Sequence, residues 1–166
     1  MRGKAAREVI VQTGHPVLRN AAAEVDIADI GTPDFDKLID FMIDVMRSAP
    51  GVGVAAPQIG IPLRLFVLED RSGGADDDDT EEREKPTVPL HVFINPVLEP
   101  VGDEIVHFYE GCLSVHGMAA VVPRWHEVKV SGLDRAGVPI EVSAAYSSGS
   151  GTSSSNDDRL TMVRIA

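Results

Sequence analysis

The strongest structural pattern in this sequence is TPDFDKLIDFMIDVMRSAPG, residues 32–51. Thr32 can cap the first turn of a helix, and Pro33 suits the first helical position because the N–H group that it lacks would have no partner there. Apolar residues recur at helical spacing along one side: Phe35, Leu38, Ile39, Met42, Val45 and Met46. This spacing predicts an amphipathic helix, and Pro50-Gly51 predicts its end.

Runs rich in β-branched and aromatic residues follow this helix and are typical of strands. They are Leu63–Glu69, Leu90–Asn95, Glu104–Glu110 and His126–Leu133. The turn at residues 134–137 joins the last run to residues 138–142 as a hairpin. The predicted fold class is therefore α+β, with an N-terminal amphipathic helix and short strands in a mixed or antiparallel sheet.

The chain length of 166 residues indicates one domain, which we assign to residues 1–143. Within it, the run of aspartates and mixed charges at residues 71–89 predicts an acidic surface loop. From residue 144 the composition becomes rich in Ser and Gly, so we expect a disordered tail over residues 144–166.

The net charge of −11 argues against nucleic acid and anionic membranes as partners, since both favour basic protein surfaces. No apolar stretch reaches the roughly 20 residues of a membrane span. The single cysteine, Cys112, cannot form an intrachain disulfide, which is typical of a reducing compartment.

Two residues stand out as candidates for chemistry. Gln58 is the only polar side chain between Gly51 and Arg64, and its amide could make a structural hydrogen bond or donate to a substrate carbonyl oxygen. Cys112, in GCLSV, could be a small core residue, a nucleophile or a metal ligand. The residues alone leave both questions open.

Taken together, GVGVAAPQIG at residues 51–60 and EGCLSV at residues 110–115 resemble two signature motifs of the peptide deformylase family. GHPVLR, FINP and VVPRWHEVKVSGLDRAG fit the same family, so that the resemblance covers residues 8 to 143. The acidic insertion and the GLDRAG region look more like its organellar, plant or mitochondrial branch. The resemblance implies metal-dependent hydrolysis of the formyl group from the N-terminal formyl-Met of newly made proteins.

The resemblance also implies roles for individual residues. Cys112 matches a thiolate ligand of Fe²⁺, Zn²⁺ or another divalent metal ion. Gln58 and the backbone N–H of Leu113 match the groups that hydrogen-bond the formyl oxygen, and Gly53 borders the substrate pocket. The implied partners are N-formyl-Met nascent peptides close to the ribosome. The implied compartment is the mitochondrion or plastid, with the cytoplasm as the alternative.

The sequence departs from this family in one motif. The chain contains no His-Glu-x-x-His, so the two histidine ligands, the general-base glutamate and the central helix that carries them in the family have no counterpart. His126-Glu127 does not replace the motif, because position 130 is Val130 and the segment is predicted to be a strand. We therefore expect a C-terminally truncated chain, and two alternatives to an active deformylase stay open: an inactive truncated or spliced form, and a remnant that binds formyl-Met peptides.

Overall fold

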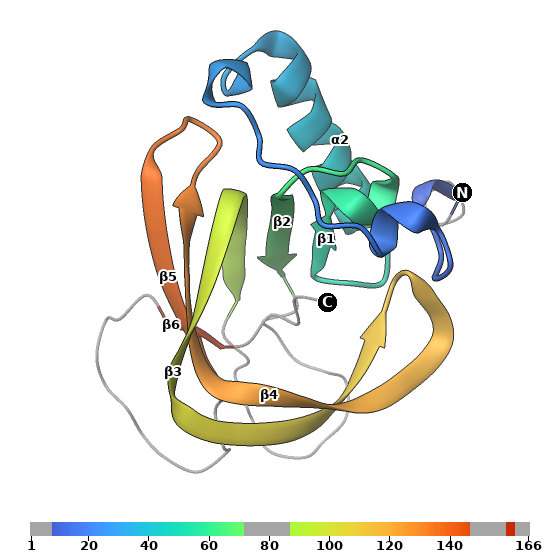
Figure 1. Ribbon diagram of the computed structural model, residues 1–166, viewed down its shortest axis with the longest axis vertical. Helices are drawn as coiled ribbons and strands as arrows, with labels where there is room; N and C mark the ends of the chain where they lie inside the picture. Colours follow the sequence, from blue (N-terminus) through green and yellow to red (C-terminus); the bar gives the residue numbers. More distant parts are fainter. Residues whose placement is uncertain (1–7, 72–86, 147–158, 162–166) are drawn as a thin grey trace.

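The computed structural model describes residues 8–71, 87–146 and 159–161. In this part of the chain one long helix packs against a sheet whose strands follow in chain order, as Figure 1 shows. The helix is α2 (Pro33–Ser48), and the strands are β1 (Gly53–Ala55), β2 (Leu65–Asp70), β3 (Val88–Cys112), β4 (Val115–Leu133), β5 (Pro139–Ala145) and β6 (Arg159–Thr161). Short 3-10 turns η1 (Pro16–Leu18), η2 (Ile27–Asp29) and η3 (Ala56–Ile59) complete the fold. Neighbouring strands are antiparallel except β5 and β6, which are parallel. The predicted α+β class is confirmed.

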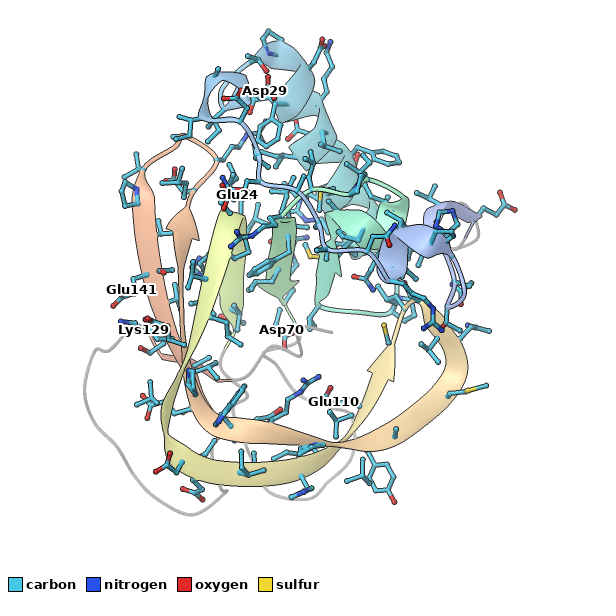
Figure 2. All side chains as sticks on the ribbon, viewed as in Figure 1. Glu24, Asp29, Asp70, Glu110, Lys129 and Glu141 are labelled. Atoms are coloured by element: carbon cyan, nitrogen blue, oxygen red, sulfur yellow. The ribbon has the colours of Figure 1, made fainter. Side chains whose placement is uncertain are left out.

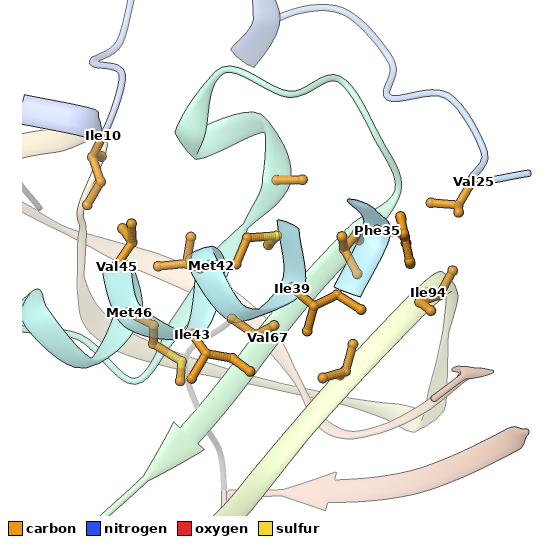
Figure 3. Packing of buried hydrophobic residues seen from close by; sticks show 14 residues of the cluster. Ile10, Val25, Phe35, Ile39, Met42, Ile43, Val45, Met46, Val67 and Ile94 are labelled. Atoms are coloured by element: carbon orange, nitrogen blue, oxygen red, sulfur yellow. The ribbon is translucent and has the colours of Figure 1, made fainter. Parts of the chain in front are cut away.

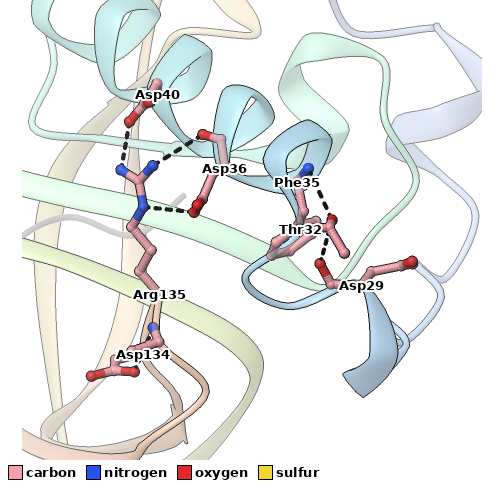
Figure 4. A network of polar contacts seen from close by, with 8 residues as sticks. Asp29, Thr32, Phe35, Asp36, Asp40, Asp134 and Arg135 are labelled. Atoms are coloured by element: carbon pink, nitrogen blue, oxygen red, sulfur yellow. Dashed lines mark hydrogen bonds and ion pairs between the residues drawn. The ribbon is translucent and has the colours of Figure 1, made fainter.

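Helix α2 forms where its sequence predicted it. The Phe35 backbone N–H donates to Thr32 Oγ1 at 3.4 Å, and the Thr32 hydroxyl donates to the Asp29 carbonyl at 2.7 Å (Figure 4). At the other end, the Ala49 N–H donates to the Val45 carbonyl at 3.0 Å, and the helix ends there. Both ends thus satisfy backbone groups that a helix leaves without intrahelical partners.

The sheet is covered by α2 on one face only. Ile39 and Met42 of α2 are fully buried against Val67 of β2 and Ile94 of β3 (Figure 3). Because side chains alternate along a strand, the neighbours of Val67 belong to the opposite face. These neighbours, Phe66 and Leu68, belong to a second buried cluster there, together with Val88, Phe93, Val130 and Val142.

Strands β3 and β4 form one long curved hairpin, of 25 and 19 residues. The runs at residues 90–95 and 104–110, which the sequence predicted as two separate short strands, are both parts of β3. The pairing with β4 shifts register between Ile94 and Val97 and again between Val101 and Ile105. These irregularities bend the paired strands without ending the pairing. In Figure 1 the hairpin therefore curves below β1 and β2, and its tip returns toward β1.

The predicted boundaries differ slightly from the observed elements. Strand β3 begins at Val88, inside the loop expected over residues 71–89, and residues 72–86 lie outside the described part of the chain. Strand β5 continues to Ala145, past the domain boundary expected at 143, and β6 falls within the expected tail. Residues 147–158 and 162–166 of that tail also lie outside the described residues. Among the helices that the structure describes, none has the length and apolar character needed to cross a membrane.

Candidate functional site

Gln58 lies in η3, the tight turn between β1 and β2, and its side chain is buried, with 8% of the residue exposed. Its Oε1 accepts a hydrogen bond from the Ala55 backbone N–H at 2.9 Å. Gly60, with a φ of +85°, closes the turn in a left-handed conformation that glycine adopts without strain. The acceptor end of the Gln58 amide therefore makes the structural hydrogen bond that the sequence left open as one alternative.

The donor end of the same amide faces the tip of the β3–β4 hairpin. Gln58 Nε2 lies 3.7 Å from Cys112 Sγ and 3.5 Å from Ser114 Oγ. The contact to Ser114 Oγ is long for an N–H···O hydrogen bond, and a thiol sulfur is a weak acceptor, so the amide hydrogens are only weakly engaged. The two motifs, 54 residues apart in sequence, thus meet with a buried amide donor beside a thiol.

Cys112 is the last residue of β3 and is partly exposed, so its place at the hairpin tip differs from that of a core cysteine. It pairs with Val115, the first residue of β4. Ser114, between the two strands, is 4% exposed. The tip therefore leaves Cys112 partly exposed while it buries Ser114.

The glycines that precede η3 allow close packing next to this tip. A Cβ atom on Gly51 would lie 3.3 Å from Leu113 Cδ1, and one on Gly53 would lie 3.3 Å from the Val67 carbonyl oxygen. The structure thus brings Gln58, Cys112 and Leu113 to one place, with Gly53 on the adjoining strand β1.

Sequence reasoning did not identify Ser114, Gly51 or Gln12 as parts of this site. The Gln12 side chain donates to the Leu113 carbonyl at 3.1 Å and accepts from the His116 backbone N–H at 3.2 Å. No local pattern could have identified Gln12, because its partners at the hairpin tip are about a hundred residues away in sequence. For Ser114 the available signal was its place in GCLSV, the same short motif that carries Cys112.

A catalytic zinc-type site needs three protein ligands and an open position. Among the described residues there is no group of three or more His, Cys, Asp or Glu side chains that could hold a metal ion. His116 and His126 both lie on β4, His116 at the hairpin tip four residues after Cys112 and His126 further along the strand, 4.0 Å from Glu104. The residues in the described part of the chain therefore do not fit a complete catalytic metal centre, and Cys112 stands as a single candidate ligand.

A cavity of about 390 Å³ adjoins the site on the face of the sheet that α2 does not cover. Its lining is mainly apolar and includes Phe66, Phe93 and Trp125. Two of the charged residues that line it are paired: Arg124 Nε and Nη2 donate to the Glu110 carboxylate at 2.8 and 2.7 Å, and this carboxylate raises the pKa of Arg124. Figure 2 shows Glu110 on the curved hairpin. The cavity is lined by Pro57 and Glu110, which are close in sequence to Gln58 and Cys112, but not by Gln58 or Cys112 themselves.

Comparison of the sequence with protein families finds one match, to the polypeptide deformylase family over residues 8–148. The chain is 49% identical over 139 residues to peptide deformylase 1A, chloroplastic/mitochondrial, of Arabidopsis thaliana, covering 82% of this chain and 52% of that protein. It is 39% identical over 128 residues to the mitochondrial peptide deformylase of Homo sapiens, covering 75% and 53%. The chain thus spans about half the length of these curated relatives.

The fold matches solved structures of the same kind. A class I type b peptide deformylase from Acinetobacter baumannii aligns with a TM-score of 0.70 and 28% identity over 81% of each chain. A Met-Ala-Ser-bound structure of that Acinetobacter enzyme aligns with a TM-score of 0.69 and 29% identity, over 81% of this chain and 80% of that one. A peptide deformylase from Legionella pneumophila aligns at 0.66 and 36% identity, over 82% of this chain and 70% of that one.

Proposed function

Because the chain belongs to the polypeptide deformylase family, whose model matches residues 8–148, we propose that it recognises the N-formylmethionyl end of new polypeptides and that the protein hydrolyses the formyl group. The observation that carries this proposal is the Gln58 amide. Its Oε1 is fixed by the Ala55 N–H, which leaves Nε2 directed toward Cys112. A buried neutral donor held in this way is suited to a formyl oxygen.

In this proposal the formyl oxygen accepts hydrogen bonds from Gln58 Nε2 and from the Leu113 backbone N–H, and Gly53 borders the peptide. These donors are held before the substrate arrives, so they need no reorganisation when negative charge develops on that oxygen. The family is metal-dependent, and Cys112 is the candidate ligand for Fe²⁺, Zn²⁺ or another divalent ion. The described residues do not complete the set of ligands that a catalytic metal ion needs.

The peptide partner and the compartment follow from the relatives. A related structure is described as bound to Met-Ala-Ser, the unformylated counterpart of a short formyl-Met peptide. Relatives from Arabidopsis and human are named as chloroplastic/mitochondrial and mitochondrial proteins. We therefore assign this chain to a plastid or mitochondrion, where it acts on formyl-Met peptides as they leave the ribosome.

The substitution Gln58→Glu tests the role of the amide donor. Glutamate keeps an oxygen that can accept from the Ala55 N–H and loses the N–H donors that face Cys112. We expect the wild-type chain to bind formyl-Met-Ala-Ser more tightly than Met-Ala-Ser in calorimetric titrations. We expect Gln58→Glu to reduce this preference by about 3- to 10-fold, the effect of one lost hydrogen bond. A wild-type chain that binds the two peptides equally would contradict the proposal.

A second candidate function is recognition of formyl-Met peptides without hydrolysis. It is favoured by the single candidate ligand, Cys112, among the described residues. Formate release from formyl-Met-Ala-Ser, measured with the 166-residue chain loaded anaerobically with Fe²⁺, separates the two candidates. Turnover that Cys112→Ser abolishes would support the hydrolase. Peptide binding without turnover, beside an active deformylase of full length as a positive control, would support the binding function.

A further inference from the structure

Three consecutive residues near the N-terminus connect the two halves of the proposed site. The Val11 N–H donates to the Gln58 carbonyl at 2.9 Å, and the Thr13 N–H donates to the Ser114 carbonyl at 2.8 Å. Between them, the Gln12 side chain reaches the hairpin tip. Residues 11–13 therefore bridge η3 and the β3–β4 tip, which carry the formyl-oxygen donors and the thiol.

Among the hydrogen bonds described for residues 11–13, those that join Gln12 to the hairpin tip use its side chain. Its Nε2 donates to the Leu113 carbonyl at 3.1 Å and to the Ile10 carbonyl at 3.2 Å, and its Oε1 accepts from the His116 N–H at 3.2 Å. One amide thus holds the tip on both sides of Ser114. The contacts of Val11 and Thr13 use backbone groups that any residue except proline would supply, whereas those of Gln12 depend on its side chain.

We propose that Gln12 is a positioning residue that fixes the segment 112–116 relative to Gln58. The Leu113 carbonyl and the Leu113 N–H belong to two planar peptide groups that are joined at the Leu113 Cα atom. Because Cys112 is paired with Val115 on one side, holding the Leu113 carbonyl on the other limits the φ and ψ values open to Leu113, and so the orientation of its N–H. The functional consequence of this inference rests on the proposed function, in which the Leu113 N–H donates to the formyl oxygen. Gln12 itself has no contact with Gln58 or with Cys112 among its hydrogen bonds, so it acts through the tip.

The test compares Gln12→Ala, Gln12→Glu and a control, Asn20→Ala, in the 166-residue chain. Glutamate keeps an acceptor for the His116 N–H and loses the donor to the Leu113 carbonyl. Asn20 is an exposed amide with no hydrogen bond to the tip among those described. Hydrogen exchange of single amides by NMR reports the tip, and alkylation of Cys112 by iodoacetamide at fixed pH reports the thiol environment.

We expect Gln12→Ala to accelerate exchange of the His116 amide by about 3- to 10-fold, as loss of one hydrogen bond implies, and to change the Cys112 alkylation rate. Gln12→Glu should keep the His116 protection while the preference for formyl-Met-Ala-Ser over Met-Ala-Ser still falls. Asn20→Ala should change none of these. A uniform rise in exchange across the chain with a lower Tm, or no change at His116, would overturn the positioning role.

Failure of this inference can be told from failure of the proposed function. If the wild-type chain shows no preference for the formyl peptide while Gln12→Ala still alters His116 exchange and Cys112 alkylation, the positioning of the tip stands and the formyl-peptide function falls. If the preference exists and Gln12→Ala leaves both the preference and His116 exchange unchanged, the positioning role falls and the proposed function stands.

Discussion

Gly132 of β4 lies where the backbones of β3 and β4 approach each other closely. A Cβ atom at this position would be 2.9 Å from the Ile94 carbonyl oxygen and 3.5 Å from Pro96 Cα. Both are backbone atoms of β3, so neither can rotate away as the end of a side chain could. We expect Gly132→Ala to lower the free energy of unfolding by about 1–3 kcal/mol, the usual effect of overpacking, as measured by urea denaturation.

Gly111 offers a matched control within the same hairpin. It is also a strand glycine, and the nearest atom to an added Cβ would be the Met118 carbonyl oxygen at 3.7 Å, an ordinary contact. Gly111→Ala should therefore change the free energy of unfolding by less than about 0.5 kcal/mol. Equal losses in the two variants would mean that the close approach at Gly132 does not determine its effect.

At the scale of elements, Asn95 connects the bend in β3 to the segment before η2. Its φ of 52° is left-handed, a conformation that Asn adopts more readily than most residues. Its Oδ1 accepts from the Val25 N–H at 2.8 Å and its Nδ2 donates to the Val25 carbonyl at 3.0 Å. The side chain thus pairs with Val25 as a strand backbone would, and Val25 is buried in the core beneath α2.

We expect Asn95→Ala and Asn95→Gly both to lose this bridge, with Ala also strained by the positive φ. The bridge should account for about 1–3 kcal/mol of unfolding free energy, since the Val25 backbone groups lose their partners. Ala should be less stable than Gly by about a further 1–2 kcal/mol. Urea denaturation of the three proteins measures both differences. An Asn95→Gly variant as stable as wild type would show that the bridge adds no stability.

The same bend explains why the sequence predicted α2 correctly and β3 only in pieces. The helix has a continuous 3.6-residue pattern, and its cap and stop residues agree with that pattern. In β3, Pro96, Pro100 and Gly102 are typical of loops, so the run appeared to end at Asn95. The strand continues because register shifts next to Pro96 and Gly102 accommodate these residues while pairing with β4 resumes on each side.

The candidate site was predictable only where a motif carries it. Gln58 and Cys112 were candidates from their chemistry alone, but physical reasoning left the role of each open, and only the resemblance to family motifs implied specific roles. The Gln58 side chain accepts from the Ala55 N–H and directs its Nε2 toward Cys112 only because the fold brings the η3 turn and the hairpin tip next to each other. Residues 11–13 join the turn to the tip, and the Gln12 side chain contacts the tip across a separation of about a hundred residues, which no local pattern encodes.

At the scale of the whole molecule, Arg135 ties the end of the sheet to the helix. It lies in the turn between β4 and β5, where Asp134 Oδ1 accepts from the Ala136 and Val138 N–H groups at 2.8 Å. From this turn the guanidinium donates to Asp36 and Asp40 of α2 (Figure 4). A second ion-paired site on the sheet, Lys129 between Glu99 and Glu141, joins only strands (Glu141 and Lys129 are labelled in Figure 2). Arg135 therefore couples two elements that are far apart in sequence.

This contact makes the stability of the fold depend on pH. The hydrogen bond from Arg135 holds the pKa of the Asp40 carboxyl below its ordinary value. A carboxyl group with a lowered folded-state pKa contributes stability above its unfolded pKa of about 4, and that contribution is lost as the pH falls through the folded pKa. The groups are partly exposed, so the effect is modest and is screened by salt.

We expect Arg135→Gln to lower the Tm by about 1–3 °C at pH 7 and low salt, because the link between α2 and the β4–β5 turn is lost. The difference from wild type should shrink below about pH 4, as Asp40 becomes protonated in both proteins. Lys37→Gln is the control, since Lys37 pairs with Asp34 inside α2 and connects no second element. Thermal scans from pH 7 to pH 3 measure these differences. A Tm difference for Arg135→Gln that persists unchanged to pH 3 would mean that the long side chain acts by packing on α2 and not by its charge.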